Sequence, residues 1–221
     1  MSEGNRSGLG YGAFRLRLFV AVELPDSGKH GAFRTWREAL ANEARALESA
    51  APGFARWVDP SLMHVTLVFL GNQDTASLPT IERAIKSAAD SLAPLALRLG
   101  TPGSFGGQRS LRVVWVGVED QPMGSLATLH SGVSAQLTAA NVAFDSAPFR
   151  AHITLGRARR DATATQSEAM YNVIARHAGE ATRPAAGVEV LDCEEVTLMR
   201  SDLRPAGPIY TPLYRARLGA R

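Results

Sequence analysis

Apolar residues recur along the chain at two spacings, which together predict strands that alternate with helices. Short runs rich in Val, Leu, Phe and Ile indicate strands, whereas apolar residues three or four positions apart indicate helices. The expected strands are 15–23, 56–58, 63–70, 95–99, 111–118, 151–156, 188–200 and 209–218. The expected helices cover 33–47, 78–92, 126–137 and 165–178. This mixture predicts an α+β fold with largely antiparallel sheets.

The second half of the chain echoes the order of elements in the first half. We therefore expect one bilobal domain over residues 14–221, in which two related lobes line a central cleft and carry helices on their outer faces. The seam between the halves is expected near residues 100–122. Residues 1–13 are rich in Gly, Ser and Asn and predict a flexible tail. The glycine-rich stretch 101–110 predicts a loop.

Composition adds a weak indication of the partner. The formal net charge is +3, and all of the 24 basic residues are arginine except Lys29 and Lys86. Guanidinium groups suit phosphate, so this bias favours an anionic partner, although a plain preference for Arg over Lys explains it equally well. The single Cys193 excludes a disulfide within the chain, which fits a reducing compartment. No apolar run is long enough to cross a membrane, and we expect a cytoplasmic monomer with no membrane partner.

One four-residue pattern occurs twice, each time inside a strand-like run. His64-Val65-Thr66-Leu67 lies in the first half, and His152-Ile153-Thr154-Leu155 lies in the second. Side chains alternate along a strand, so each histidine shares a face with the threonine two positions later. If the lobes are related by a pseudo-twofold axis, the two pairs of imidazole and hydroxyl converge on one cleft.

Two such pairs supply what the cleavage of a cyclic phosphodiester requires. The pKa of imidazole lies near neutrality, so one histidine can take a proton from water while the other gives a proton to the leaving ribose oxygen. Thr66 and Thr154 can donate hydrogen bonds to the phosphate. The scheme needs no metal or cofactor, and no close His/Asp/Glu cluster has the spacing of metal ligands. The alternatives are an ordinary polar pair in each strand, a duplicated structural histidine, or a metal site.

Seven segments, spread over about residues 15–217, carry a resemblance to a known family. They are Arg17–Val22, Trp57-Val58, His64–Gly71, Arg112–Gly117, Pro148-Phe149, His152–Arg157 and Tyr210–Leu213. In this order they resemble the two-histidine (2H) phosphoesterase superfamily. Within it, the chain is most similar to the RNA 2′,3′-cyclic phosphodiesterases, historically called 2′-5′ RNA ligases.

The resemblance implies an activity and roles for the paired residues. The activity is hydrolysis of a 2′,3′-cyclic phosphate to a 2′-phosphomonoester, on RNA ends or small cyclic nucleotides. His64 would be the proton donor toward the 3′ oxygen and His152 the proton acceptor from water, with Thr66 and Thr154 at the phosphate. Two alternatives stay open. One is a 2′-5′ RNA ligase that joins RNA (tRNA) halves with the same residues, and the other is a non-catalytic module that binds RNA ends.

Arg157 is a conditional candidate for the phosphate site. It matches an arginine of the family, but strict alternation places it with Ile153 and Leu155, away from the cleft. It reaches the phosphate if the strand ends or bulges near Gly156, and otherwise forms a surface salt bridge.

Aromatic residues provide candidates for stacking on a nucleobase. Phe105, in the expected loop, is the preferred one, because Trp115 and Tyr210 lie in strand-like runs and are more typical of a strand core. The other histidines are interpreted as ordinary helix residues: His30, His130 and His177.

Overall fold

The structure is a computed structural model that describes residues 14–24, 31–179, 190–205 and 207–219. The tail expected at residues 1–13 and the proposed position of His30 lie outside the described residues. The described strands are β1 (Arg15–Glu23), β2 (Ala55–Trp57), β3 (His64–Asp74), β4 (Leu95–Gly107), β5 (Ser110–Gln121), β6 (His152–Ala158), β7 (Leu191–Cys193), β8 (Glu195–Arg204) and β9 (Gly207–Arg217). The described α-helices are α1 (Gly31–Ala50), α2 (Leu78–Asp90), α3 (Ser125–Ala139) and α4 (Ala164–Gly179).

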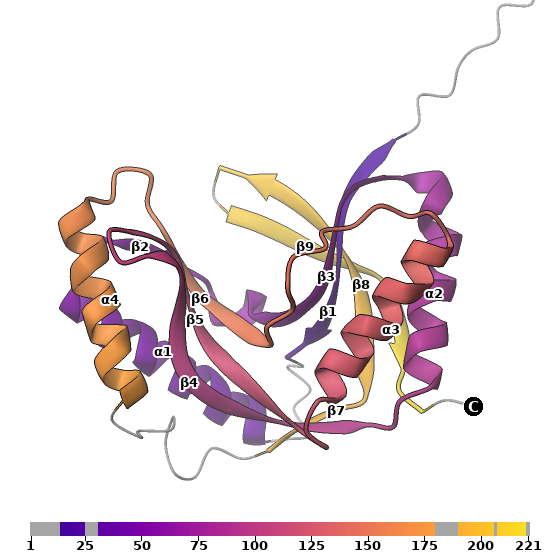
Figure 1. Cartoon of the computed structure of the whole chain (residues 1–221), viewed down its shortest axis with the longest axis horizontal. Helices are drawn as coiled ribbons and strands as arrows, with labels where there is room; N and C mark the ends of the chain where they lie inside the picture. The colour runs from indigo at the N-terminus through magenta and orange to yellow at the C-terminus, as the bar shows by residue number, and fades with distance from the viewer. Residues whose placement is uncertain (1–13, 25–30, 180–189, 206, 220–221) are drawn as a thin grey trace, which may run out of the picture.

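The strands form one curled antiparallel sheet in the order β7-β4-β5-β6-β3-β1-β8-β9, and β2 pairs with the end of β6. Every strand pair in it is antiparallel, as the sequence predicted. The two halves of the sheet meet at β3 and β6, which share a single paired position, Val65 with Ile153. The α+β fold with two related lobes is confirmed (Figure 1).

The helices cover the outer faces, but they do not follow the seam expected near residues 100–122. α1 packs against α4 beside β4, β5 and β6, and α3 packs against α2 beside β1, β3, β8 and β9 (Figure 1). The first helix of each half of the chain, α1 or α3, therefore packs in the other lobe. No single cut in the sequence separates the lobes, because the burial of these helices depends on partners from the other half.

The core explains the long apolar run of β1, which lies in the interior of the sheet. Leu18, Val20 and Val22 belong to the large core beneath the helices. Phe19 and Ala21 point to the opposite face, where they form a small cluster with Met199 against Tyr210. Because both faces of β1 are covered, its residues are apolar at consecutive positions rather than at alternate ones.

The prediction of a loop at residues 101–110 is wrong, because β4 continues through Gly107 and pairs with β5 along this stretch. Its glycines have a packing role. A Cβ at Gly103 would lie 2.2 Å from Cη2 of Trp115, the residue that pairs with it on β5. The indole therefore requires glycine there, and the stretch reads as a loop only when this cross-strand neighbour is unknown.

Candidate active site

The cleft begins where β3 and β6 diverge after their shared position. The open edge of β3 does not lack hydrogen bonds: the carbonyl of Leu67 accepts from Nδ1 of His130 at 2.9 Å, and that of Phe69 accepts from the backbone N–H of Asp145 at 2.8 Å. On β6, the carbonyl of Leu155 accepts from the backbone N–H of Val58 at 2.8 Å. Because other segments satisfy these carbonyls, the strands stay apart without leaving buried polar groups unpaired.

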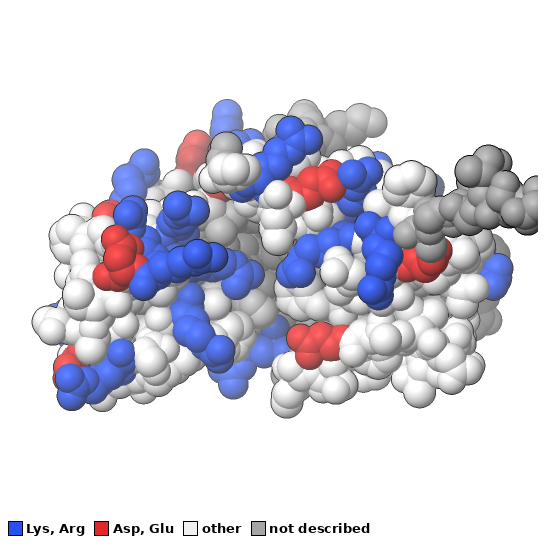
Figure 2. All heavy atoms as spheres, turned by 90° about the horizontal axis from the view of Figure 1, so that it is seen from above, with Lys and Arg blue, Asp and Glu red and all other residues white. Residues whose placement is uncertain are grey.

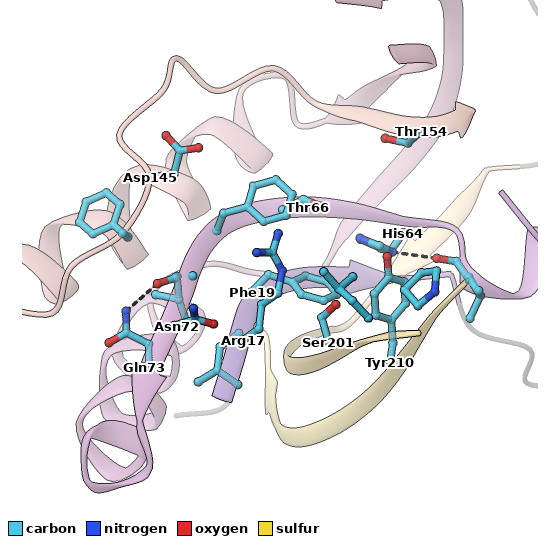
Figure 3. Close-up of a pocket in the computed structure, with 18 of the residues that line it drawn as sticks. Arg17, Phe19, His64, Thr66, Asn72, Gln73, Asp145, Thr154, Ser201 and Tyr210 are labelled. Carbon is cyan, nitrogen blue, oxygen red and sulfur yellow. Dashed lines mark hydrogen bonds between the residues drawn. The ribbon is translucent and has the colours of Figure 1, made fainter. Parts of the chain in front are cut away.

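The two motif histidines are oriented by the same hydrogen bond. Nδ1 of His64 lies 2.8 Å from the carbonyl oxygen of Leu62, and Nδ1 of His152 lies 2.7 Å from that of Arg150. A carbonyl oxygen accepts and does not donate, so each Nδ1 carries the proton. Nε2 of each ring is then left as a base when the ring is neutral and as an acid when it is charged. Figure 3 shows this bond for His64.

Two adjoining cavities lie over the motifs. The larger, about 720 Å³, is lined by His64, Thr66, Thr154 and Arg157, together with Tyr210 and others (Figure 3). The smaller, about 500 Å³, is lined by His152, Phe105, Phe149, His130 and Arg150, among others. Thr66, Phe69 and Asp145 line both. The structure thus brings all four predicted His and Thr side chains to one continuous depression, which is large enough for a nucleotide.

A β-bulge turns Arg157 toward this depression. Thr154 pairs with Trp115 and Gly156 pairs with Val114, the residue before it on β5, so Leu155 is an extra residue on β6. The bulge breaks the alternation: Leu155 and Gly156 are both buried, and Arg157 lines the larger cavity. The condition that the sequence set for Arg157 is met, since the extra residue returns it to the face of Thr154.

Burial lowers the pKa of both imidazoles, because it disfavours the charged form. The carbonyl hydrogen bonds act in the opposite direction, and the positive charge of Arg157 lowers both pKa values further. Glu23, which accepts hydrogen bonds from Thr197 and Arg215, partly offsets these effects at His64. Each ring therefore gives up its proton more readily, and stays neutral over a wider pH range, than an imidazole in water.

Aromatic rings flank each histidine. His64 lies 4.8 Å from Phe19 and 5.2 Å from Tyr210, measured between ring centroids. His152 lies 4.9 Å from Phe105 in an edge-to-face arrangement, and 5.9 Å from Trp115. Phe105 therefore faces the smaller cavity from β4. Tyr210, set aside as a core residue, lines the larger cavity.

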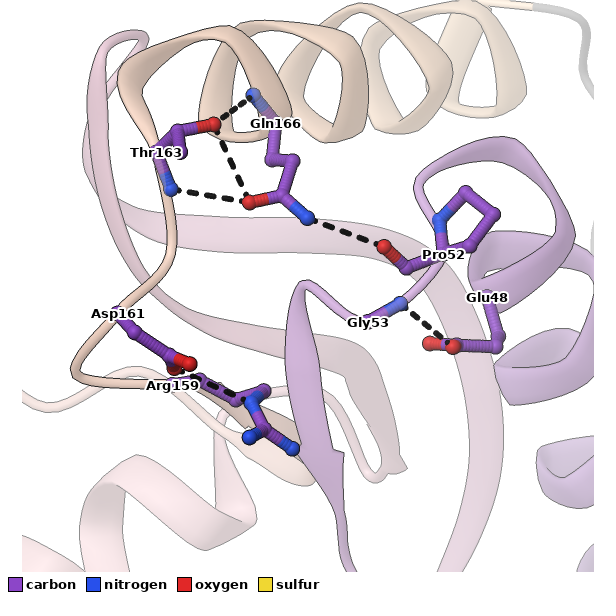
Figure 4. A network of polar contacts seen from close by, with 7 residues as sticks. All are labelled: Glu48, Pro52, Gly53, Arg159, Asp161, Thr163 and Gln166. Carbon is purple, nitrogen blue, oxygen red and sulfur yellow. Dashed lines mark hydrogen bonds and ion pairs between the residues drawn. The ribbon is translucent and has the colours of Figure 1, made fainter.

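Short polar contacts hold β2 against the end of β6. Glu48 at the end of α1 accepts hydrogen bonds from the backbone N–H of Gly53 and from Nε1 of Trp57, both at 2.8 Å. Gln166 donates to the carbonyl of Pro52 at 3.1 Å and forms a reciprocal capping box with Thr163 at the start of α4 (Figure 4). These contacts fix Trp57 over Gly156 and so support the bulge that directs Arg157.

Basic side chains gather on both sides of the central hollow (Figure 2). Arg17 and Arg157 line the larger cavity and Arg150 lines the smaller one, whereas Asp145 is the one acidic residue that lines either of them within the described ranges. Such a balance favours an anionic ligand. In the described ranges, no group of three or more His, Cys, Asp or Glu is arranged to hold a metal ion. None of the described helices is long and apolar enough to cross a membrane.

Sequence reasoning missed several residues of the depression. Phe19 and Arg17 share a face of β1, but the unbroken apolar run of that strand hides which face it is. Asp145 and His130 reach the site from a loop and a helix whose positions depend on tertiary contacts. Local patterns carry no signal for them.

Paired His-x-Thr strands that converge on one cleft in this fold define the class of two-histidine phosphoesterases. A family model described as the 2′-5′ RNA ligase superfamily matches residues 30–205. An RNA 2′,3′-cyclic phosphodiesterase of Thermus thermophilus is 31% identical over 208 residues, which cover 92% of this chain and 90% of that protein. One from Archaeoglobus fulgidus is 28% identical over 198 residues, or 90% and 98% of the two chains.

A solved structure supports the same assignment. The apo form of LigT from E. coli matches with a TM-score of 0.64 at 25% identity, over 92% of this chain and 98% of that one. LigT has also been crystallised with 3′-AMP and with phosphate. The chain therefore belongs to the 2′-5′ RNA ligase superfamily, and the family resemblance seen in the sequence is confirmed.

Proposed function

We propose that this protein is an RNA 2′,3′-cyclic phosphodiesterase that produces 2′-phosphomonoester ends. The observation that carries the proposal is the matched pair of imidazoles, each held by a carbonyl at Nδ1 and each beside a threonine in one depression. The names of the relatives, and the 3′-AMP and phosphate complexes of LigT, support the substrate class.

The reaction needs two proton transfers on opposite sides of one phosphorus atom. His152 takes a proton from water as the water oxygen bonds to phosphorus. His64 gives its proton to the 3′ oxygen as the bond between that oxygen and phosphorus breaks, which leaves the phosphate on the 2′ oxygen. Burial is the largest influence on both rings and lowers the pKa of each, whereas Glu23 raises the pKa of His64 and Arg150 lowers that of His152. These two neighbours act in the directions that an acid at His64 and a base at His152 need.

The phosphate itself is held by neutral and charged donors. The hydroxyls of Thr66 and Thr154 and the guanidinium of Arg157 supply hydrogen bonds and positive charge to its oxygens, where negative charge develops. In this proposal Phe105 contacts a nucleobase from the edge of the smaller cavity. The chemistry uses no metal ion.

The test is a product analysis with an oligonucleotide that ends in a 2′,3′-cyclic phosphate, in the presence of a chelator. We expect turnover to a 2′-phosphate. A 3′-phosphate product would contradict the regiochemistry, and loss of turnover with the chelator would contradict metal independence. Tight binding without turnover would instead favour an RNA-end binding module. RNA halves with a 5′-hydroxyl, added in a second arm, test for a joined 2′-5′ product.

The state of the protein in the cell is a separate prediction. We expect a monomer in the cytoplasm, and gel filtration with light scattering tests the first part of that expectation.

A further inference from the structure

A third histidine, His130 on α3, contacts elements of two half-sites. We use this term for the His64–Leu67 motif and the His152–Leu155 motif, each with the residues that support it. Its Nδ1 lies 2.9 Å from the carbonyl oxygen of Leu67 on β3. Its ring is stacked on Phe149, with centroids 4.6 Å apart and planes within 12°. It is half-buried and lines the smaller cavity together with His152. The motif chemistry does not use it.

The carbonyl that His130 holds belongs to a bulge. Ala21 pairs with Thr66 and Val20 pairs with Val68, so Leu67 is an extra residue on β3. It corresponds to Leu155 in the second half, which is the extra residue on β6. A bulge redirects the side chains on either side of it, and in both halves the residue just before it is the motif threonine.

The two bulges are held by different kinds of donor. The carbonyl of Leu155 accepts from a backbone N–H, that of Val58. The carbonyl of Leu67 accepts from the His130 side chain instead. A backbone donor is available at every residue except proline, but a side-chain donor depends on the residue type. The first half-site thus depends on His130 for a contact that the main chain supplies in the second.

The stacking contact reaches the other half-site. Phe149 directly precedes Arg150, whose carbonyl accepts the hydrogen bond from Nδ1 of His152. The imidazole of His130 therefore touches the segment that orients His152, while its nitrogen holds the residue that follows Thr66. One side chain contacts the supports of both motifs.

We propose that His130 is a positioning residue that couples the two half-sites by fixing the Leu67 bulge and the Phe149–Arg150 segment. The proposal rests on the two-histidine phosphodiesterase function above. Since the Leu67 carbonyl accepts, the ring must carry a proton on Nδ1, and it acts through Thr66 and His152 rather than on the substrate.

The variants separate the donor from the ring. His130→Phe keeps a ring for Phe149 but removes the donor, whereas His130→Asn places an amide N–H near the position of Nδ1. We expect His130→Phe to lower kcat for a 2′,3′-cyclic nucleotide by about 10- to 100-fold with KM within about twofold, because small misplacements of catalytic groups have effects of this size. His130→Asn should recover part of that loss, because it restores a donor for the Leu67 carbonyl but not the ring that stacks on Phe149.

His177→Phe is the matched control. His177 lies on α4 and also uses Nδ1 in a side-chain contact, 3.0 Å from Oε1 of Glu43, but it lines neither cavity. This variant should leave kcat unchanged. Thermal unfolding of each variant ensures that rates are compared on folded protein.

Wild-type kcat in His130→Phe, or equal losses in folded His130→Phe and His130→Asn, would overturn the proposal. A second measurement does not depend on any variant being folded. The ¹⁵N resonances of wild-type His130 should show a protonated Nδ1 near pH 7, and an unprotonated Nδ1 would also overturn it. If the wild-type protein had no turnover, that result would count against the phosphodiesterase function. The nitrogen resonances would still show whether His130 donates its hydrogen bond to the carbonyl of Leu67.

Discussion

His64 and His152 lie on strands with the same local plan, yet in different surroundings. Each ring is held by the carbonyl two residues before it, and each threonine precedes a bulge. His64 is the more deeply buried ring, packed between Phe19 and Tyr210. His152 lies in a more open part of the depression, next to Phe105 and Trp115.

The sharpest difference lies five residues after each histidine. The bulges bring Phe69 and Arg157 to corresponding positions at the depression, and one is an apolar ring where the other is a cation. The comparison teaches that the repeated motif supplies two equivalent proton carriers, while non-repeated neighbours make them unequal. At this corresponding position, only the second half supplies a positive charge.

The largest effect is expected from the histidines themselves. His64→Ala and His152→Ala should each lower kcat by about 10²–10⁴-fold, the usual contribution of general acid–base catalysis. A nucleoside 2′-phosphodiester with nitrophenol as leaving group separates their roles, because such a group leaves without a proton. On this substrate, the kcat of His64→Ala should return to near that of the control variant His177→Ala. The kcat of His152→Ala should stay low. Recovery of His152→Ala instead would reverse the roles.

A substitution of Arg157 tests whether the cation at this position matters for the reaction. Arg157→Met should lower kcat/KM by about 10²-fold, as the loss of a single preorganised donor does at other anionic transition states. Arg159→Met is the control, since Arg159 follows on the same segment and pairs with Asp161 at 3.2 Å. Steady-state kinetics on a 2′,3′-cyclic nucleotide measure both. Similar kinetics for the two variants would remove Arg157 from the phosphate site.

Gly156 tests the support of the second bulge. A Cβ there would lie 2.8 Å from Cε3 of Trp57, whose indole is held by Glu48, so Gly156→Ala should destabilise the protein by about 1–3 kcal/mol. Gly107→Ala is the control, because its Cβ would meet the mobile hydroxyl of Ser110 at 3.2 Å. Urea unfolding compares the two. Equal midpoints would mean that Trp57 moves aside freely.

The smallest effect is expected in the pH dependence. Burial is the larger cause of the lowered pKa values, and Arg157 contributes a smaller part. Removing this cation makes protonation easier, so the pKa values of both rings rise in Arg157→Met. The base must be neutral to accept a proton, so the acid limb of the kcat/KM profile should move to higher pH. The apparent pKa values of this profile belong to His64 and His152 together rather than to either ring alone. An NMR titration that showed no rise, or a fall, would count against this.

Local patterns predicted much of this molecule. The limits of β1 at residues 15–23 match the predicted strand, and the shared face of each His and Thr follows from a period of two residues. Gly103 shows where such reasoning stops, since glycine reads as a loop residue until the indole of Trp115 is known to lie across from it. Whether His64 and His152 carry out the roles proposed for them stays a prediction.

What the sequence by itself determined was the repeated unit: two strands, each with an imidazole and a hydroxyl on one face and apolar residues on the other. Tertiary structure decided how the units meet, because the single paired position of Val65 with Ile153, the exchange of α1 and α3, and both bulges depend on pairing between distant segments. A bulge is defined by the partner strand against which the extra residue is counted. Periodicity therefore could not show that Arg157 turns to the depression or that His130 holds Leu67.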